Sequence, residues 1–248
     1  MARHRWTLVL LLALFPAPGA EAALLPQAAP EARTHPDPVA MEAFLDGLIM
    51  GALRERSIAG ATLAVVGGGE VLFTRGYGWA DVEARRPVDP DETLFRIASV
   101  TKLFTAVAVM QLVEEGLLDL DTDVNRYLEL RIPAHDSGPI TLRHLLTHTA
   151  GFEDDFRNLF SFDPTREISP EAWLRENLPP RVRPPGVWSV YSNHGTALAG
   201  HIVERVSGMH WEEYLERRIL EPLGMTRTTG REPLPTALAP LASEGYAP

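Results

Sequence analysis

Residues 95–102 have the sequence Phe95-Arg96-Ile97-Ala98-Ser99-Val100-Thr101-Lys102, which brings a serine and a lysine within three positions of each other. The apolar run that follows predicts a helix from Val100 to a stop near Gly116. Residues i and i+3 lie on the same face of a helix, so we expect the Lys102 amine to reach the Ser99 oxygen.

A serine beside a lysine is a candidate pair of nucleophile and base. A serine hydroxyl attacks a carbonyl only when a base removes its proton, and an uncharged amine is such a base. A helix N-terminus and burial both favour the uncharged amine, and the Ser99 backbone N–H at that helix end is one donor for a developing oxyanion. The same pattern also fits an N-capping serine followed by a solvated lysine, so the spacing alone leaves both interpretations open.

Lys102 is the only lysine in the chain. The other 22 of the 23 basic residues are arginine, a composition typical of drift towards arginine. An arginine replaces a surface lysine wherever charge alone matters, but a guanidinium does not lose its proton near neutral pH. Drift explains the composition but not why this one lysine was spared, and a need for a deprotonated amine at that position is one interpretation.

The composition of the 248 residues excludes several classes of function. An apolar fraction of 45% indicates a globular chain. A net charge of −10, without any basic run, excludes nucleic acid as a partner, because such binding depends on clustered Lys and Arg. The absence of cysteine excludes disulfides, thiolate nucleophiles and zinc–thiolate sites.

The first 22 residues are expected to be a signal peptide. Arg3 and Arg5 precede an apolar stretch of about 10 residues, and Ala20-Glu21-Ala22 is a cleavage site of the A-x-A type. The stretch is shorter than the roughly 20 residues that cross a bilayer, although an uncleaved anchor is the alternative. Residues 23–38, which are rich in Ala and Pro, are expected to be a linker. The mature protein would then be exported, either to the periplasm or out of the cell.

Residues 39–248 are expected to form one α+β domain. An apolar stripe predicts a helix from Val39 to Gly51, and two β-prone runs predict an antiparallel hairpin of residues 61–66 and 71–77. Residues 93–97 resemble a strand. Further helices are predicted at residues 142–147, 170–177, 195–206 and 211–220. The order of elements favours α+β over a doubly wound sheet.

Tyr191-Ser192-Asn193 precedes one of these helices and carries two polar groups of short reach. A phenol at Tyr191 would relay a proton to or from a serine oxygen, and an amide at Asn193 would hydrogen-bond a substrate carbonyl. The alternative is an ordinary loop before a helix, with Asn193 as the N-cap and Tyr191 as a half-buried aromatic.

Two other clusters have metal-like spacing but lack essential ligands. His144 and His148 are four residues apart on a predicted helix, yet no glutamate lies between them. Asp119, Asp121 and Asp123 alternate like the start of a calcium loop, but the glycine and final glutamate of such a loop are absent. We therefore expect no metal, and we expect the aspartates to form a turn between helices.

Four blocks of sequence, taken in order, resemble one family. They are residues 95–102, residues 140–152, Pro184-Pro185-Gly186 leading into Tyr191-Ser192-Asn193, and Pro222-Leu223-Gly224-Met225. Together they are similar to the serine β-lactamase and penicillin-binding-protein superfamily. The likeness is greatest to its class C branch, which includes D-alanyl-D-alanine carboxypeptidases and related esterases, and it covers residues 39–248.

The resemblance implies an antiparallel sheet flanked by helices, together with a mainly helical subdomain. It implies that Ser99 is the acylated nucleophile and Lys102 its base partner. It further implies that Tyr191 is a proton relay and Asn193 a substrate-orienting amide. The expected partners are small-molecule substrates or peptides derived from peptidoglycan: a β-lactam, a D-alanyl peptide or a small ester, with no cofactor. The block at residues 140–152 is structural in this family and packs below the site.

One block of the resembled family is missing. Its members carry a third motif, a strand with Lys or His that ends in glycine and supplies the second oxyanion N–H, and residues 222–248 contain nothing similar. The chain is therefore expected to be an N-terminal part of a longer protein, without the last strands of the sheet. The rival interpretation is a non-catalytic penicillin- or peptidoglycan-binding module, or an inactive truncated homologue. Contact with a membrane would come only through a segment after residue 248.

Overall fold

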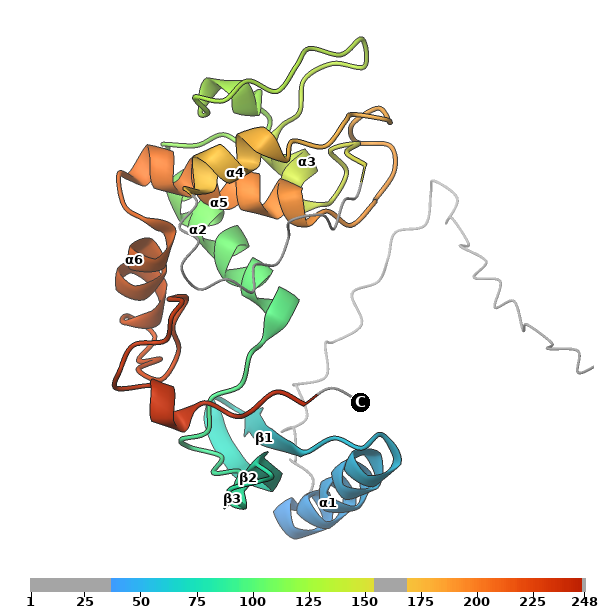
Figure 1. The fold of residues 1–248 in the computed structure, drawn as a ribbon, viewed down its shortest axis with the longest axis vertical. Coiled ribbons are helices and arrows are strands. Elements are labelled where there is room, and N and C mark those ends of the chain that lie inside the picture. The colour runs from blue at the N-terminus through green and yellow to red at the C-terminus, as the bar shows by residue number, and fades with distance from the viewer. Residues whose placement is uncertain (1–36, 154–168, 247–248) are drawn as a thin grey trace, which may run out of the picture.

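The computed structural model describes residues 37–153 and 169–246 (Figure 1). The expected signal peptide, residues 1–22, lies outside the described residues, as does the expected linker except for its last two positions. The last of these, Pro38, already begins the helix α1 (Pro38–Glu55). No helix in the two described ranges is both long enough and apolar enough to cross a membrane.

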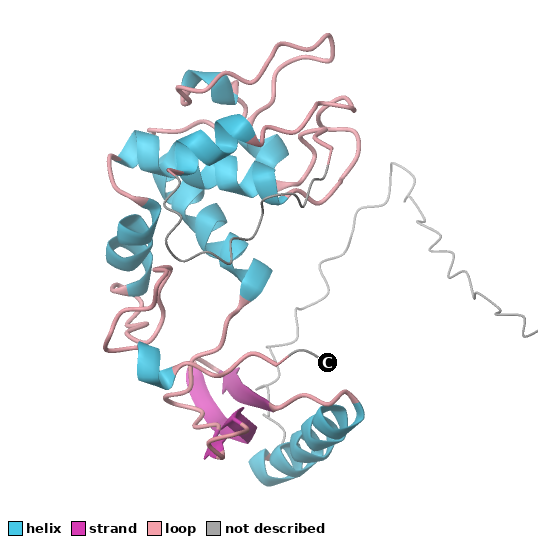
Figure 2. Ribbon diagram, viewed as in Figure 1, coloured by secondary structure: helices cyan, strands magenta, loops and turns pink. Residues whose placement is uncertain are grey.

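The strands form one small antiparallel sheet at one end of the molecule (Figure 2). β1 (Gly60–Gly67) pairs with β2 (Glu70–Asp81), and β3 (Arg86–Pro87) pairs with the other edge of β2. α1 packs beside this sheet, where the Tyr77 hydroxyl donates to the Asp46 carboxylate at 2.7 Å. The predicted hairpin is therefore confirmed, with strands longer than the β-prone runs.

The turn of this hairpin depends on its glycines. Gly67 pairs with Glu70, so only two residues form the loop. These two residues, Gly68 and Gly69, have φ angles of 62° and 87°. Two-residue hairpin loops need positive φ to match the twist of the strands, and glycine adopts it without steric cost. The glycine cluster therefore sets the register of the sheet.

The helices form a second group around two central members, α2 (Lys102–Glu114) and α5 (Asn193–Ser207), which pack against each other. α3 (Leu142–Leu146), α4 (Pro170–Glu176) and α6 (Trp211–Leu215) all pack on α5. The remaining helical segments are short: η1 (Ala98–Thr101), η2 (Val124–Arg126), η3 (Glu216–Leu220) and η4 (Ala239–Leu241). The antiparallel sheet and the helical group together make the expected α+β fold.

The chain after η3 returns to the sheet and ties the two groups together (Figure 1). Leu94 N donates to Leu241 O at 2.9 Å, and Ser243 N donates to Leu94 O at 2.8 Å. This is an isolated parallel bridge between Leu94 and Ala242 rather than a ladder. Residues 93–97, which resemble a strand in sequence, are therefore not one here, because only Leu94 has a backbone partner of that kind in the described chain.

Three predicted helices differ from those observed, and the first of them, predicted to end near Gly51, continues as α1 to Glu55. The segment 211–220 is not one α-helix, because α6 ends at Leu215 and continues as the π-helical η3. The helix after Ser99 begins as the 3-10 segment η1 and becomes α-helical only at Lys102. The helices predicted at residues 142–147, 170–177 and 195–206 are confirmed within two residues at each end.

The stability of the helical group should fall when one substitution creates a cavity in its core. Leu198 of α5 is fully buried in the main hydrophobic cluster, whereas Leu223 is 67% exposed. We expect Leu198→Ala to lower the free energy of unfolding by about 2–5 kcal/mol, because both transfer free energy and packing are lost. Leu223→Ala is the matched control and should change it by about 0.5 kcal/mol or less. Urea unfolding followed by circular dichroism measures both, and equal effects would contradict this placement of the core.

Candidate active site

Ser99 lies at an exposed turn where the chain enters the helical group. It is the second residue of η1, directly before α2, and its side chain is open to solvent. Ala98, the residue before it, has φ of +44°, a left-handed conformation that costs free energy for any residue except glycine. Strained backbone of this kind persists where the surroundings enforce it and is common at active sites. The turn presents the Ser99 hydroxyl at the end of a rigid helix.

Lys102 makes the contact with Ser99 that the spacing predicts. Its Nζ donates to Ser99 Oγ at 3.1 Å and to Asn193 Oδ1 at 2.7 Å. Ser99 is not an N-cap, because the N-cap position of α2 is Thr101, which makes no side-chain capping bond. Lys102 is also only partly exposed, so the solvated-lysine interpretation is wrong as well.

Tyr191 completes a cluster around the serine oxygen. Its Oη lies 2.6 Å from Ser99 Oγ, and its ring centroid lies 4.9 Å from Lys102 Nζ. Ser99 Oγ is therefore within hydrogen-bond distance of both an amine and a phenol. The structure brings together all four residues singled out in the sequence, Asn193 included.

Asn193 is free to reach Lys102 because another residue caps its helix. Ser192 is the N-cap of α5, where its Oγ accepts from Gly195 N at 3.0 Å. The alternative prediction that Asn193 is the N-cap is therefore wrong. With Oδ1 directed to the Lys102 amine, the side-chain NH₂ of Asn193 is the group left to donate to a ligand.

The first turn of α5 is also anchored by a buried histidine. His194 lies between Phe152 and Trp173, with ring centroids 5.9 Å and 5.5 Å away. Burial lowers the pKa of His194 to about 4, so its imidazole is neutral at physiological pH. This apolar anchoring holds the first turn of α5, which begins with Asn193.

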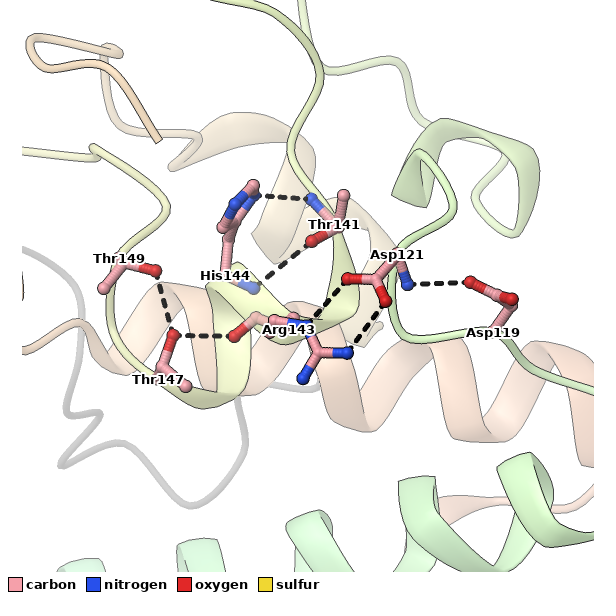
Figure 3. Close-up of polar contacts among 7 residues, drawn as sticks. All are labelled: Asp119, Asp121, Thr141, Arg143, His144, Thr147 and Thr149. Atoms are coloured by element: carbon pink, nitrogen blue, oxygen red, sulfur yellow. Dashed lines mark hydrogen bonds and ion pairs between the residues drawn. The ribbon is translucent and has the colours of Figure 1, made fainter. Parts of the chain in front are cut away.

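The block at residues 140–152 contains a turn that is braced by its own side chains (Figure 3). Thr141 caps α3: its Oγ1 accepts from His144 N at 3.4 Å, while Thr141 N donates to His144 Nδ1 at 3.2 Å. At the other end, the Thr147 hydroxyl donates to Arg143 O at 2.8 Å and contacts the Thr149 hydroxyl at 2.9 Å. Both ends of α3 are therefore held by side chains of the block itself.

The aspartates before this block take part in turns and in one ion pair (Figure 3). Both carboxylate oxygens of Asp121 accept from the Arg143 guanidinium, at 2.7 and 2.8 Å. This hydrogen bond holds the pKa of Asp121 below its usual range. Asp119 accepts from Asp121 N, and Asp123 caps η2. No cluster of three or more metal-ligating side chains occurs in residues 37–153 and 169–246.

His148 is the residue at the site that the sequence did not single out as functional. Its ring centroid lies 4.6 Å from that of Tyr191, and its Nδ1 accepts from Ser192 N at 3.2 Å. Only its place four residues after His144 was noted in the sequence, and that spacing suggested a metal rather than a contact with tyrosine. No local sequence signal marks it, because the turn at Thr147-His148-Thr149 brings the imidazole to the tyrosine segment only in the folded chain.

A cavity of about 370 Å³ adjoins the site. Lys102 and Asn193 line one part of it, and His201, Glu204 and Trp211 line another. Glu204 accepts from Trp211 N at 2.9 Å and contacts His201 Nδ1 at 3.0 Å. A group bound in the cavity would therefore lie next to the Lys102 amine. The hydrogen-bonded side chains of Glu204 and His201 would line another part of the same cavity.

The fold and the site together define an α+β protein with a Ser-x-x-Lys pair. A second segment of the chain adds Tyr191 and Asn193 to this pair. The family model described as Beta-lactamase matches residues 42–247, and the chain belongs to this family.

The relatives of the chain include an esterase and penicillin-binding proteins. It is 37% identical to esterase EstB of Burkholderia gladioli over 212 residues, which are 76% of this chain and 51% of the esterase. It is 31% identical to penicillin-binding protein 4* of Bacillus subtilis over 181 residues, 71% of this chain and 39% of that protein. The chain thus spans about half the length, or less, of these curated relatives.

Solved structures give the same result. An octameric penicillin-binding protein homologue from Pyrococcus abyssi has a TM-score of 0.66 and 35% identity, over 75% of this chain and 44% of that chain. A class C β-lactamase has a TM-score of 0.69 and 26% identity, over 87% of this chain and 57% of that chain. Both likenesses confirm the resemblance and the fold expected from the sequence.

Proposed function

We propose that the protein is an exported serine hydrolase that forms an acyl-enzyme at Ser99 and acts on ester or amide substrates. The observation that carries this proposal is the position of Ser99 Oγ, 3.1 Å from Lys102 Nζ and 2.6 Å from Tyr191 Oη. An oxygen within reach of two groups that exchange protons is what nucleophilic catalysis by serine requires. Export rests on the signal-like sequence of residues 1–22.

In the acylation step, a bond forms between Ser99 Oγ and the substrate carbonyl carbon while the hydroxyl proton passes to uncharged Lys102 Nζ. The carbonyl oxygen becomes an oxyanion, for which the Ser99 backbone N–H is one donor. The bond from that carbon to the alcohol or amine then breaks, and the leaving group takes a proton from Tyr191 Oη, which regains one from Lys102. Asn193 holds the Lys102 amine in place at 2.7 Å and offers its NH₂ to the acyl group.

Deacylation runs through the same groups in reverse. Tyr191 Oη takes a proton from a water molecule while it passes its own proton to Lys102 Nζ, the water oxygen bonds to the acyl carbon, and the bond to Ser99 Oγ breaks. The proton then returns to Ser99 Oγ, and the carboxylic acid leaves. Lys102 Nζ and Tyr191 Oη each lie within hydrogen-bond distance of Ser99 Oγ, and the proposed steps use no cofactor.

Esters are the first substrates to test. The names of the relatives include an esterase, penicillin-binding proteins and a methylbutanoyltransferase, all compatible with acyl transfer through a serine. Small esters need less activation than peptides, because an alcohol is a better leaving group than an amine. β-Lactams and D-alanyl peptides remain the amide candidates within this proposal.

The test is covalent labelling of the whole protein with a fluorophosphonate and with a fluorescent penicillin, combined with turnover of p-nitrophenyl acetate. Trypsin cleaves after Arg96 and Lys102, so Ser99 falls in the peptide of residues 97–102. We expect the label on that peptide and hydrolysis of the ester. Labelling by penicillin without turnover of any substrate would instead support a penicillin-recognising module. Absence of both label and turnover overturns the proposal.

A further inference from the structure

We propose that His148 is a positioning residue for Tyr191: its neutral imidazole holds the tyrosine hydroxyl against Ser99. This inference rests on the proposed acylation at Ser99 and adds a residue to its machinery. It also assigns a protonation state to that residue, since the contacts made by the imidazole require one particular tautomer.

His148 contacts three consecutive residues of the tyrosine segment. Its carbonyl oxygen accepts from Val190 N at 2.8 Å, and its Nδ1 accepts from Ser192 N at 3.2 Å. Its ring packs on that of Tyr191, with centroids 4.6 Å apart and planes tilted by 37°. The backbone on both sides of Tyr191 and the ring itself are therefore bound by one residue, which leaves the phenol little freedom to move away from Ser99.

His148 is itself held firmly. It has φ of +57°, the left-handed conformation, and lies directly after α3. Its backbone N donates to Leu145 O at 3.2 Å, and the next residue, Thr149, donates from its N to His144 O at 2.8 Å. The hydroxyls of Thr147 and Thr149 close the same turn at 2.9 Å (Figure 3). A strained conformation fixed by so many bonds indicates a side chain that must point in one direction.

The contact with Ser192 determines the tautomer of His148. A backbone N–H only donates, so Nδ1 must carry a lone pair, and the proton of the neutral ring is on Nε2. The titratable groups that face this ring in the described chain are Lys102 of α2 and Tyr191. Burial lowers the pKa of His148 below its usual range. A second proton, on Nδ1, would remove the acceptor for Ser192 N and so break this contact.

The sign of the pH effect follows from these contacts. Because the pKa of His148 in the folded protein lies below the ordinary value of 6.5, the ring stays neutral at pH 7 and becomes charged only at lower pH. The hold on Tyr191 is therefore present above that pKa and lost as the pH falls through it. A residue that does not titrate should keep its hold at acid pH, where the wild type loses it.

Two substitutions that tolerate a positive φ separate the roles of the imidazole. His148→Asn keeps an acceptor oxygen near the place of Nδ1, and His148→Gly removes both ring and acceptor without backbone strain. We expect His148→Gly to slow acylation of Ser99 about 10- to 100-fold, since a small misplacement of a reacting group costs that much. His148→Asn should be several-fold faster than His148→Gly at pH 7. Its rate relative to wild type should rise below pH 6.5.

A double-mutant cycle with Tyr191→Phe separates positioning from general destabilisation. If His148 acts through the tyrosine hydroxyl, His148→Gly should slow acylation little further once that hydroxyl is gone. His144→Asn is the matched control, because His144 occupies the same block and accepts a backbone N–H in the same way, from Thr141. It should leave the acylation rate within about twofold of wild type, and thermal unfolding of each variant checks that it is folded.

The outcomes are distinct from those of the proposed function. If wild-type Ser99 is labelled but His148→Gly labels as fast as wild type, the inference is wrong and the proposed function stands. Full additivity of His148→Gly with Tyr191→Phe, or equal rates for the Asn and Gly variants at all pH values, also overturns it. If wild type is never labelled, the proposed function fails and the inference fails with it.

Discussion

Ser99→Ala should reduce covalent labelling and ester turnover to the background level, a loss of at least about a thousandfold. The substitution removes the one oxygen that lies within reach of both Lys102 Nζ, at 3.1 Å, and Tyr191 Oη, at 2.6 Å. Without it no acyl-enzyme forms, whatever the substrate. Because Ser99 is exposed and does not cap α2, the free energy of unfolding should change by only about 0.5 kcal/mol.

The matched control for this experiment is Thr101→Ala. Thr101 carries the other hydroxyl of the tryptic peptide 97–102, so the two variants decide between the two hydroxyls of that peptide. Thr101→Ala should keep the label, and Ser99→Ala should lose it, in the same intact-mass measurement. Retention of the label by Ser99→Ala would move the nucleophile to another residue and contradict the site described here.

The local part of the site could be predicted because it depends on spacing alone. Three residues along a helical chain bring Ser99 and Lys102 to one face, and the structure shows them in contact. Tyr191 and Asn193 lie about 90 residues further on, and no local rule brings them to the serine. The chemistry and spacing of these two residues also fitted an ordinary loop. Only the family resemblance predicted that they belong to the site.

The faces of α2 show what a sequence pattern leaves undetermined. Leu103, Val107 and Met110 follow a helical spacing that suggests a core stripe, yet these side chains are 65%, 44% and 42% exposed. The buried side is instead that of Val109 and Leu112, which pack towards α5. The helix is apolar on both sides, so its periodicity predicts that a helix forms without predicting which side faces the neighbours.

The role of His148 was hidden for a different reason. Its contacts are with the backbone of residues 190 and 192 and with an aromatic ring, and none of these has a signature in sequence. Histidine pairs four residues apart suggest a metal site, because metal binding does have a recognisable sequence signature. Ala98 is similar: nothing about an alanine indicates that its φ will be +44°. Strain and backbone contacts are set by tertiary packing, which local patterns do not encode.

Under the proposed mechanism, the position of Lys102 predicts that this one lysine cannot be exchanged for arginine. Its Nζ lies 2.7 Å from an amide oxygen and 3.1 Å from the Ser99 hydroxyl, a geometry for one compact amine. A guanidinium is larger and planar, and it keeps its proton throughout the working pH range. Exposed arginines such as Arg96, which pairs with Glu232 at 2.9 Å, make ion pairs, a contact for which a positive charge suffices.

Lys102→Arg should therefore slow the acylation of Ser99 by several orders of magnitude, about 10³-fold or more, because the proton of the serine has no acceptor. The reciprocal substitution Arg96→Lys is the matched control and should leave the rate within about twofold, since an exposed ion pair contributes little. Stopped-flow labelling measures both. Lys102→Met keeps the length of the side chain without the amine, and it should be as slow as Lys102→Arg. If Lys102→Arg acylates at nearly the wild-type rate, Lys102 is not the base, and Tyr191 would have to take the serine proton instead.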